Sequence, residues 1–128
     1  MARRPSDLLT GAELELMKSL WSLGSGSVRD VMAVGSDARA YTSVATILRV
    51  MERKGYLSSE ARGRTMVFHP TVTRDAYETR SLRSLARSLF GGEPSAMVAR
   101  LVDDDSLDDA EVAAIRRVVE ARFGDGDG

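Results

Sequence analysis

Residues 40–55, AYTSVATILRVMERKG, constrain the fold of this chain more than any other stretch. At about 100° per residue, an α-helix over this stretch places four apolar side chains on one narrow face: Val44, Ile47, Leu48 and Met51. The opposite face carries short hydroxyls and guanidinium groups: Thr42, Thr46, Arg49 and Arg53. Gly55 favours the end of the helix there, because glycine accepts the left-handed conformation that follows a last turn. The pattern predicts a helix with one face in a core and one polar face outside.

The polar face has two interpretations. Threonine hydroxyls and arginine guanidinium groups have the size and the donors to contact base edges and phosphates in a DNA major groove. Hydroxyls and arginines on the outer face are also typical of an ordinary solvated helix. The segments on either side of the helix therefore decide between a recognition helix and a solvated one.

The residues that follow the helix predict a β-hairpin with arginines at its tip. Residues 56–70 have the pattern of two short strands around a tip at residues 61–64. Gly63 supplies a permissive turn residue, which leaves Arg62 and Arg64 flanking an exposed loop. Arginines in such a wing usually contact phosphates and position the domain without reading sequence.

A first helix is expected before this region, and it begins at a capping box. Thr10 and Glu13 have the spacing at which a hydroxyl and a carboxylate cap the first turn reciprocally. The helix is expected to run to about Leu23. Its expected core residues are Leu14, Met17, Leu20 and Trp21.

Ser27 and Asp30 repeat the capping spacing and predict a second, short helix that Gly35 ends. Two such helices, a turn and the helix at residues 40–55 match a helix-turn-helix, in which the last helix enters the groove and the preceding one crosses the backbone. Arg29 then lies near the start of the crossing helix. Its guanidinium group either holds a phosphate or is simply solvated.

Three further helices are expected after the hairpin. Thr73 is placed to cap a helix over residues 74–90, whose apolar residues lie on more than one face and predict burial from several sides. A helix over residues 95–102 follows. Ser106 and Asp109 are expected to cap the last helix.

About fifty residues of helix are too few for a stable core of their own. They pack either on the N-terminal part or on a second copy, and a dimer is favoured because a helix-turn-helix reader normally binds two half-sites. The residues expected at the dimer interface are Leu85, Leu89, Val98, Leu101, Val112, Ile115 and Val119. We expect a winged helix-turn-helix DNA-binding domain at residues 1–72 and a helical dimerisation region with a disordered tail at residues 73–128.

Charge is distributed unevenly along the chain. The net charge is −1, but residues 1–70 hold 10 basic and 7 acidic side chains whereas residues 71–128 hold 8 and 12. The basic half coincides with the expected DNA reader, and the acidic half is expected to face away from DNA. The N-terminal arm that carries Arg3 and Arg4 is interpreted as a disordered tail.

Composition excludes several classes of function. The chain has no cysteine and one histidine, His69, so disulfides, thiolate metal sites and multi-histidine metal sites are impossible. No nucleophile-and-base constellation of an enzyme is recognisable, and neither a cofactor nor a metal is expected. No apolar run reaches the roughly 18 residues of a membrane span, and the N-terminus lacks the apolar segment of a signal peptide. We expect a cytoplasmic protein without membrane insertion.

Four segments together resemble the penicillinase-repressor (BlaI/MecI) family of winged-helix regulators. They are LTGAELELMKSLW, AYTSVATILRVMERKGYL, EARGRTMVFHP and GGEPSAMVARLVDDDSLDDAEVAAIRRVVE. The resemblance implies a dimeric repressor of beta-lactamase and related resistance genes that binds palindromic operators with TACA/TGTA half-sites. It also implies a partner, a membrane sensor of the metalloprotease type, that triggers cleavage in the C-terminal region and so releases the DNA.

Carried over by resemblance, the base-reading residues are Thr42, Ser43, Thr46 and Arg49, with Arg62 and Arg64 in the wing. Two departures limit the transfer. Members under proteolytic control have an Asn-Phe bond where this chain has Arg100-Leu101, which puts cleavage there in doubt. The copper-responsive branch has a cysteine-rich C-terminal hook, which this sequence lacks. A winged-helix protein-interaction module that does not bind DNA remains the alternative.

Overall fold

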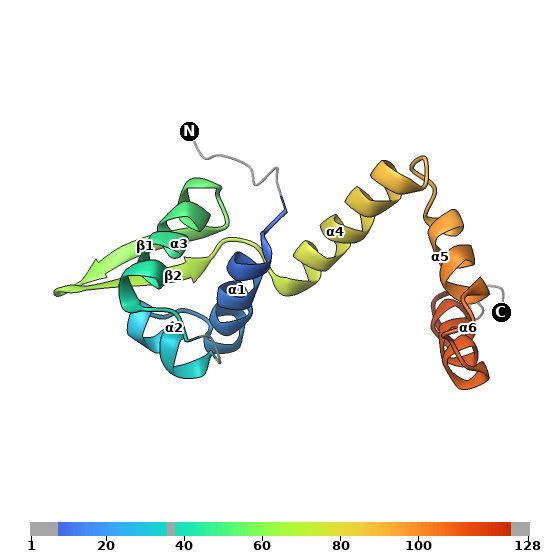
Figure 1. Cartoon of the computed structure of the whole chain (residues 1–128), viewed down its shortest axis with the longest axis horizontal. Helices are drawn as coiled ribbons and strands as arrows, with labels where there is room; N and C mark the ends of the chain where they lie inside the picture. Colours follow the sequence, from blue (N-terminus) through green and yellow to red (C-terminus); the bar gives the residue numbers. More distant parts are fainter. Residues whose placement is uncertain (1–7, 36–37, 124–128) are drawn as a thin grey trace. The chain divides into compact units, whose positions relative to one another are not determined.

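The computed structural model describes residues 8–35 and 38–123 (Figure 1). Within these ranges the chain is mainly helical with one two-stranded antiparallel sheet, as predicted. The elements are α1 Gly11–Leu23, α2 Val28–Val34, α3 Tyr41–Arg53, β1 Leu57–Arg62, β2 Thr65–Pro70, α4 Arg74–Leu89, α5 Pro94–Asp103 and α6 Asp109–Phe123. The predictions for the Arg3/Arg4 arm and for the C-terminal tail lie outside the described residues. The chain divides into two compact units, Met1–Ser81 and Leu82–Gly128.

Both predicted capping boxes are confirmed. The Thr10 hydroxyl accepts a hydrogen bond from the backbone N–H of Glu13 at 3.2 Å, and the Glu13 carboxylate accepts one from the N–H of Thr10 at 2.8 Å. Ser27 and Asp30 make the same reciprocal pair at 3.1 and 3.0 Å. Two of the four free N–H groups at each helix start are thereby satisfied.

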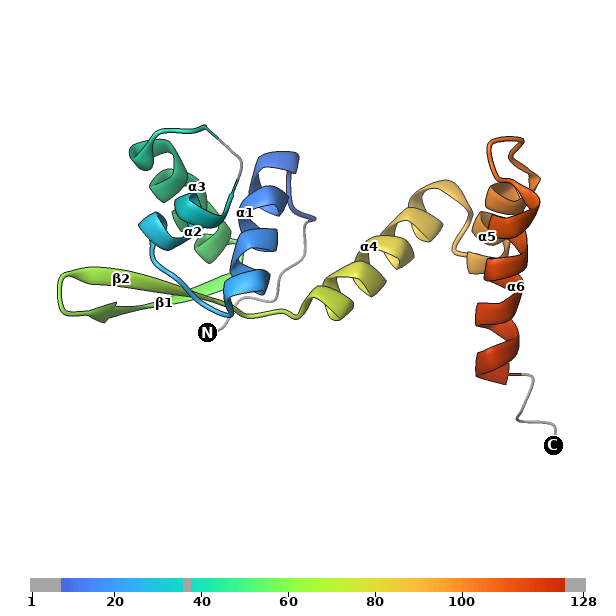
Figure 2. The same cartoon turned by 90° about the horizontal axis from the view of Figure 1, so that it is seen from below.

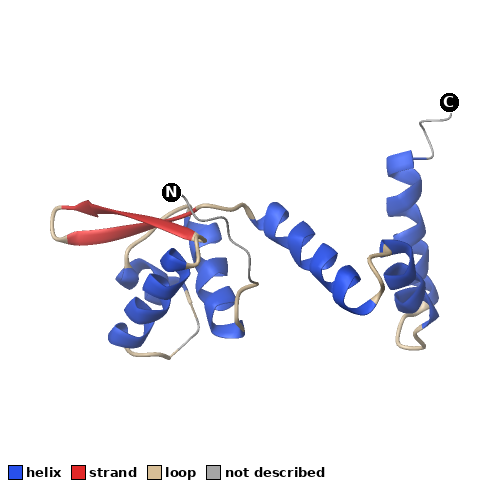
Figure 3. Ribbon diagram, turned by 90° about the horizontal axis from the view of Figure 1, so that it is seen from above, coloured by secondary structure: helices blue, strands red, loops and turns tan. Residues whose placement is uncertain are grey.

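The core of the first unit forms where α1, α2 and α3 pack on one another and on the base of the hairpin. Figures 2 and 3 show the three helices gathered on one side of the hairpin, whose turn reaches beyond them. Backbone hydrogen bonds in both directions between Gly26 and Phe68, at 3.0 and 2.8 Å, tie the start of α2 to β2. The most deeply buried side chains are Met17, Leu20, Val31, Val44, Leu48, Met51, Tyr56 and Phe68.

The buried face of α1 is rotated from the predicted one. Leu16 is buried, although it was not expected in the core, whereas Leu14 and Trp21 are only half-buried. At 100° per residue, the face that contains Leu16 and Leu20 also contains Glu13, and Leu14 and Trp21 lie at its edge. The spacing alone did not identify this face, because a buried carboxylate interrupts its apolar pattern.

The apolar face of α3 is confirmed for three residues and shifted for the fourth. Val44, Leu48 and Met51 are buried, whereas Ile47 is half-buried at the edge of the face. Gly55 follows the helix with φ 93°, the left-handed conformation that glycine adopts at low cost.

The hairpin has a shorter tip than the sequence predicted. Strand β1 continues to Arg62, which pairs with Thr65, so the connection consists of Gly63 and Arg64 alone. The prediction that residues 61 and 62 belong to the tip was therefore wrong. Gly63 has φ 64°, and a two-residue connection with positive φ at its first position matches the twist of the strands, which lets the ladder extend.

The first turns of α4 belong to the first unit because Tyr77 is part of its core. The Tyr77 ring lies 5.8 Å from the rings of both Trp21 and Tyr56, and its hydroxyl accepts a hydrogen bond from the N–H of Leu9 at 2.9 Å. The indole N–H of Trp21 donates to the Val72 carbonyl at 2.9 Å. The first unit therefore extends beyond the boundary expected at residue 72. Thr73 caps α4 as predicted, accepting from the N–H of Ala76 at 3.1 Å.

The second unit differs from prediction at two points. Leu82, Leu85 and Leu89 are exposed in the single chain, so the prediction that this helix is buried from several sides was wrong for one chain alone. The last helix is capped by Asp108, whose carboxylate accepts from the N–H of Glu111 at 2.8 Å, and not by Ser106 or Asp109. Asp108 stands directly before the first helical residue, the position at which its carboxylate reaches a free N–H. No helix in the described part of the chain is long and apolar enough to span a membrane.

Candidate nucleic-acid interface

The outer face of α3 presents the predicted polar side chains to solvent. Exposed along it are Thr42, Ser43, Thr46, Arg49 and Arg53. A shallow hollow of about 410 Å³ lies over the first half of the helix, lined by Arg39, Thr42, Ser43, Thr46 and Ile47. The Thr46 hydroxyl donates to the Thr42 carbonyl at 2.9 Å, which leaves its oxygen free to accept a hydrogen bond from an outside donor.

Arg49 lies beside an acidic residue that is itself bonded to the hairpin. Its guanidinium nitrogen Nη1 is 3.9 Å from Oε1 of Glu52. The other carboxylate oxygen of Glu52 accepts a hydrogen bond from the Ser59 hydroxyl in β1. Glu52 therefore links α3 to the first strand and lies close enough to attract the Arg49 guanidinium group.

The two arginines of the hairpin differ in their surroundings. Arg62 Nη2 lies 2.8 Å from Oε1 of Glu60, and His69 Nε2 lies 2.9 Å from the same oxygen. The hydrogen bonds from His69 and Arg62 hold the pKa of Glu60 below its ordinary value of 4.5. Arg64 is exposed in the turn and forms no ion pair with the described residues. Arg64 therefore has no carboxylate partner among the described residues, whereas Glu60 partly offsets the charge of Arg62.

The Arg29 guanidinium group contacts an aromatic ring. The guanidinium carbon of this exposed α2 residue lies 5.3 Å from the centroid of the Tyr41 ring, at the first position of α3. This distance is within the range of a cation–π interaction. The structure therefore places Arg29 against the start of the helix whose outer face carries the predicted readers.

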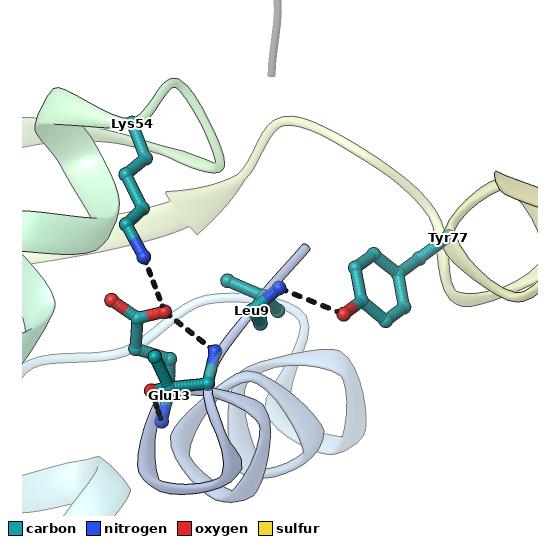
Figure 4. Close-up of polar contacts among 5 residues, drawn as sticks. Leu9, Glu13, Lys54 and Tyr77 are labelled. Carbon is teal, nitrogen blue, oxygen red and sulfur yellow. Dashed lines mark hydrogen bonds and ion pairs between the residues drawn. The ribbon is translucent and has the colours of Figure 1, made fainter. Parts of the chain in front are cut away.

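A partly buried ion pair links the end of α3 to α1 (Figure 4). Glu13 is only 4% exposed, and its carboxylate accepts a hydrogen bond from the Lys54 ammonium group at 2.8 Å. Burial by itself raises the pKa of Glu13, but the Lys54 hydrogen bond, the N–H of Thr10 and the positive charge of Lys54 outweigh burial and lower it below 4.5. The pair joins the first turn of α1 to the residue that closes the recognition helix.

Sequence reasoning missed four residues at this face. Arg39 lines the hollow, Tyr41 holds Arg29, and Glu52 and Glu60 engage arginines. Arg39 could have been found from its position as a basic residue directly before the recognition helix. The Glu52–Arg49 pair has the three-residue spacing of neighbours on a helix, and Glu60–Arg62 has the two-residue spacing of neighbours on one face of a strand.

The residues expected at a dimer interface lie in the second unit and fall into two groups. Leu85, Leu89, Val98, Leu101 and Val119 are exposed. Val112 and Ile115 are half-buried within the single chain. Val118 is also exposed, at 70%, although it was not among the predicted residues.

Comparisons with known proteins find relatives in sequence and in solved structure. A penicillinase repressor of Bacillus licheniformis is 25% identical over 114 residues, which cover 88% of this chain and 89% of the relative. An uncharacterized 16.5 kDa protein in the ptsI 3' region of Latilactobacillus sakei is 25% identical over 124 residues, covering 95% of this chain and 84% of that protein. Among solved structures, a chain of Bordetella bronchiseptica BpsR, whose DNA binding is regulated by 6-hydroxynicotinic acid, matches with a TM-score of 0.46 and 19% identity over 89% of this chain and 75% of the other.

The family assignment rests on the extent of the sequence match. The profile of the penicillinase repressor family covers residues 9–121, which include the helix-turn-helix, the hairpin and nearly all of the C-terminal helices. Members of this family are transcription regulators and not enzymes. The chain therefore belongs to the penicillinase repressor family.

Proposed function

We propose that this repressor binds palindromic operator DNA as a homodimer, with α3 in the major groove and the hairpin against neighbouring phosphates. The observation that carries the proposal is the exposed row Thr42, Ser43, Thr46, Arg49 and Arg53 on a helix whose other face is buried. A helix held in a core by one face can present the other to base edges without losing its fold.

The readers and the phosphate contacts are assigned by chemistry. Thr42, Ser43 and Thr46 are short enough for close approach to base edges, and Arg49 can bond a guanine through two donors. Arg53, at the end of α3, and Arg64, in the hairpin turn, contact phosphates. These contacts fix the register of α3 on the duplex, while the hydroxyls and Arg49 supply the sequence preference.

The apolar side chains of the second unit support the proposed homodimer. Leu89 is 69% exposed and Val119 is 51% exposed in the single chain, although both are apolar. A two-fold partner buries the same patch on both copies, and it brings two recognition helices to two half-sites. We assign operators with TACA/TGTA-like half-sites, and beta-lactamase or related genes as targets, by membership of the family.

Family membership also suggests a membrane sensor of the metalloprotease type as the partner that releases the repressor. Arg100 and Leu101, which stand where cleaved members have their scissile bond, are exposed on α5. Proteases bind extended chain, so cleavage at this bond requires α5 to unwind locally. No residue of α5 is fully buried in the single chain. Release by proteolysis therefore requires the unwinding of a helix that few packing contacts hold in place.

The test is DNA binding measured by fluorescence anisotropy at several salt concentrations. One duplex carries a palindrome of TACA/TGTA half-sites, and a second has the same composition in scrambled order. We expect tighter binding to the palindrome and a logarithmic salt slope of about −0.9 for each phosphate contacted. Equal binding to both duplexes contradicts an operator reader, and no binding to either identifies a protein-interaction module instead.

A further inference from the structure

We infer that Tyr41 is a positioning residue for DNA binding, because its ring holds the Arg29 guanidinium group ready for a backbone phosphate. The inference rests on the proposed function and adds a residue to it. Tyr41 is not in the row of base-reading side chains. Its spacing from Val44 and Leu48 places it at the end of the apolar face of α3, but its side chain is exposed. It is 47% exposed and stands at the first position of the helix.

The geometry between the two side chains carries the assignment. Arg29 is on α2, Tyr41 is on α3, and the guanidinium carbon lies 5.3 Å from the ring centroid. The attraction is between the positive charge and the electron-rich face of the ring. A guanidinium group that packs on a ring by its flat face keeps the N–H donors at its edge available to a phosphate.

This arrangement differs from the other restrained arginines of the site. Glu60 bonds Arg62 at 2.8 Å, and Glu52 lies 3.9 Å from Arg49, so a carboxylate offsets each charge. Arg29 forms no ion pair within the described part of the chain. The ring carries no net charge, so Tyr41 positions Arg29 without offsetting its positive charge.

A positioning residue and a phosphate-contacting residue affect different measured quantities: the first changes the affinity alone, and the second changes the salt slope as well. If Arg29 contacts a phosphate, Arg29→Ala removes one counterion-releasing contact and the salt slope falls by about 0.9. Tyr41→Leu leaves that arginine able to reach the phosphate, so the salt slope stays the same. Affinity then falls only by the lost preorganisation, about two- to fivefold for an exposed cation–π pair.

The experiment measures affinity and salt slope for four full-length variants: Arg29→Ala, Tyr41→Leu, Tyr41→Phe and the double variant Arg29→Ala/Tyr41→Leu. Phenylalanine keeps the ring face, so Tyr41→Phe is expected to restore binding to within about twofold of the original chain. In the Arg29→Ala background, Tyr41→Leu is expected to have no further effect. Val34→Ala, which removes an apolar side chain of similar exposure, 48%, from α2, is the matched control for surface changes.

Each outcome decides one point. A loss with Tyr41→Phe assigns the contact to the tyrosine hydroxyl and overturns the inference. An equal loss for Tyr41→Leu with and without Arg29 overturns it as well, because the two residues then act independently. If the original chain shows no preference for the palindromic duplex, the proposed function fails first. If the preference is present and Tyr41→Leu changes nothing, only the positioning role fails.

Discussion

The Nζ atom of Lys54 lies 2.8 Å from Oε1 of Glu13, in a pair that joins residues 41 positions apart. The Glu13 side chain is 6% exposed and the Lys54 side chain is 27% exposed, so water screens the pair only in part. The same carboxylate oxygen accepts the N–H of Thr10, which makes one residue both a helix cap and a link to the end of α3. An ion pair outside the DNA-facing surface therefore helps the core to hold the end of the recognition helix against α1.

Lys54→Met is expected to lower the free energy of unfolding by about 1–3 kcal/mol at pH 7, because it leaves a buried carboxylate without its charged donor. The pKa of Glu13 is lowered in the folded chain, so its contribution is fully present above the ordinary value of 4.5 and is lost as the pH falls through the folded value. Urea unfolding at pH 7 and pH 3 measures both effects. The difference between variant and original chain should shrink at pH 3, and a constant difference would mean that Glu13 does not carry it.

The hairpin arginines are expected to act on all DNA alike. Arg64→Ala should weaken binding to operator and to scrambled duplex by similar factors and lower the salt slope by about 0.9. Arg62→Ala should cost less, because Glu60 already compensates its charge. Glu60→Gln should strengthen binding to both duplexes by at most about fivefold, since an exposed ion pair is weak. A change in base preference for any of these variants would make the hairpin a sequence reader.

The outer and inner faces of α3 should respond in opposite ways. Thr46→Ala and Arg49→Ala remove exposed side chains, and each should reduce operator binding selectively, by about 1–3 kcal/mol where a good base contact is lost. Leu48 is fully buried, so Leu48→Ala should instead lower stability by about 2–5 kcal/mol. Thermal melting and anisotropy on the same samples separate the two effects. If Arg49→Ala unfolds the domain while Leu48→Ala does not, the assignment of the faces is wrong.

The elements that sequence reasoning placed correctly are those with a local signal. The capping boxes depend on residues three positions apart, and the faces of α3 depend on helical spacing, so both could be read along the chain. Gly63 indicated where the hairpin turns, but it did not indicate how far the hydrogen bonds between the two strands continue toward the turn. Because Arg62 was assigned to the tip, its place next to Glu60 on one face of a strand was hidden.

Several of the features that sequence reasoning missed join distant positions. Glu13 forms an ion pair with Lys54, and Tyr77 packs in the core against Trp21 and Tyr56. A short stretch of sequence does not contain both partners of these contacts, so its pattern cannot predict them. The buried carboxylate of Glu13 also disguised the inner face of α1, since a charged residue is expected outside unless its partner is known.

The dimer is tested best at side chains that the single chain leaves exposed. Ile115 is half-buried in its own unit, so an aspartate there would disturb the fold as well as the interface. Leu89 and Val119 are 69% and 51% exposed, so Leu89→Asp with Val119→Asp costs the single chain little but places unpaired charges in a two-fold interface. The double variant should fold normally by circular dichroism and sediment as a monomer.

The operator affinity of the Leu89→Asp/Val119→Asp variant should fall steeply, because the binding of one recognition helix no longer brings the second one to its half-site. Binding to a single half-site should change little. The charge-matched control is Ser88→Asp with Ala113→Asp, both exposed positions off the apolar stripes, and it should remain dimeric. Sedimentation equilibrium at micromolar concentration decides between the two states. An original chain that sediments as a monomer, or a Leu89→Asp/Val119→Asp variant that keeps full operator affinity, would remove the homodimer from the proposed function.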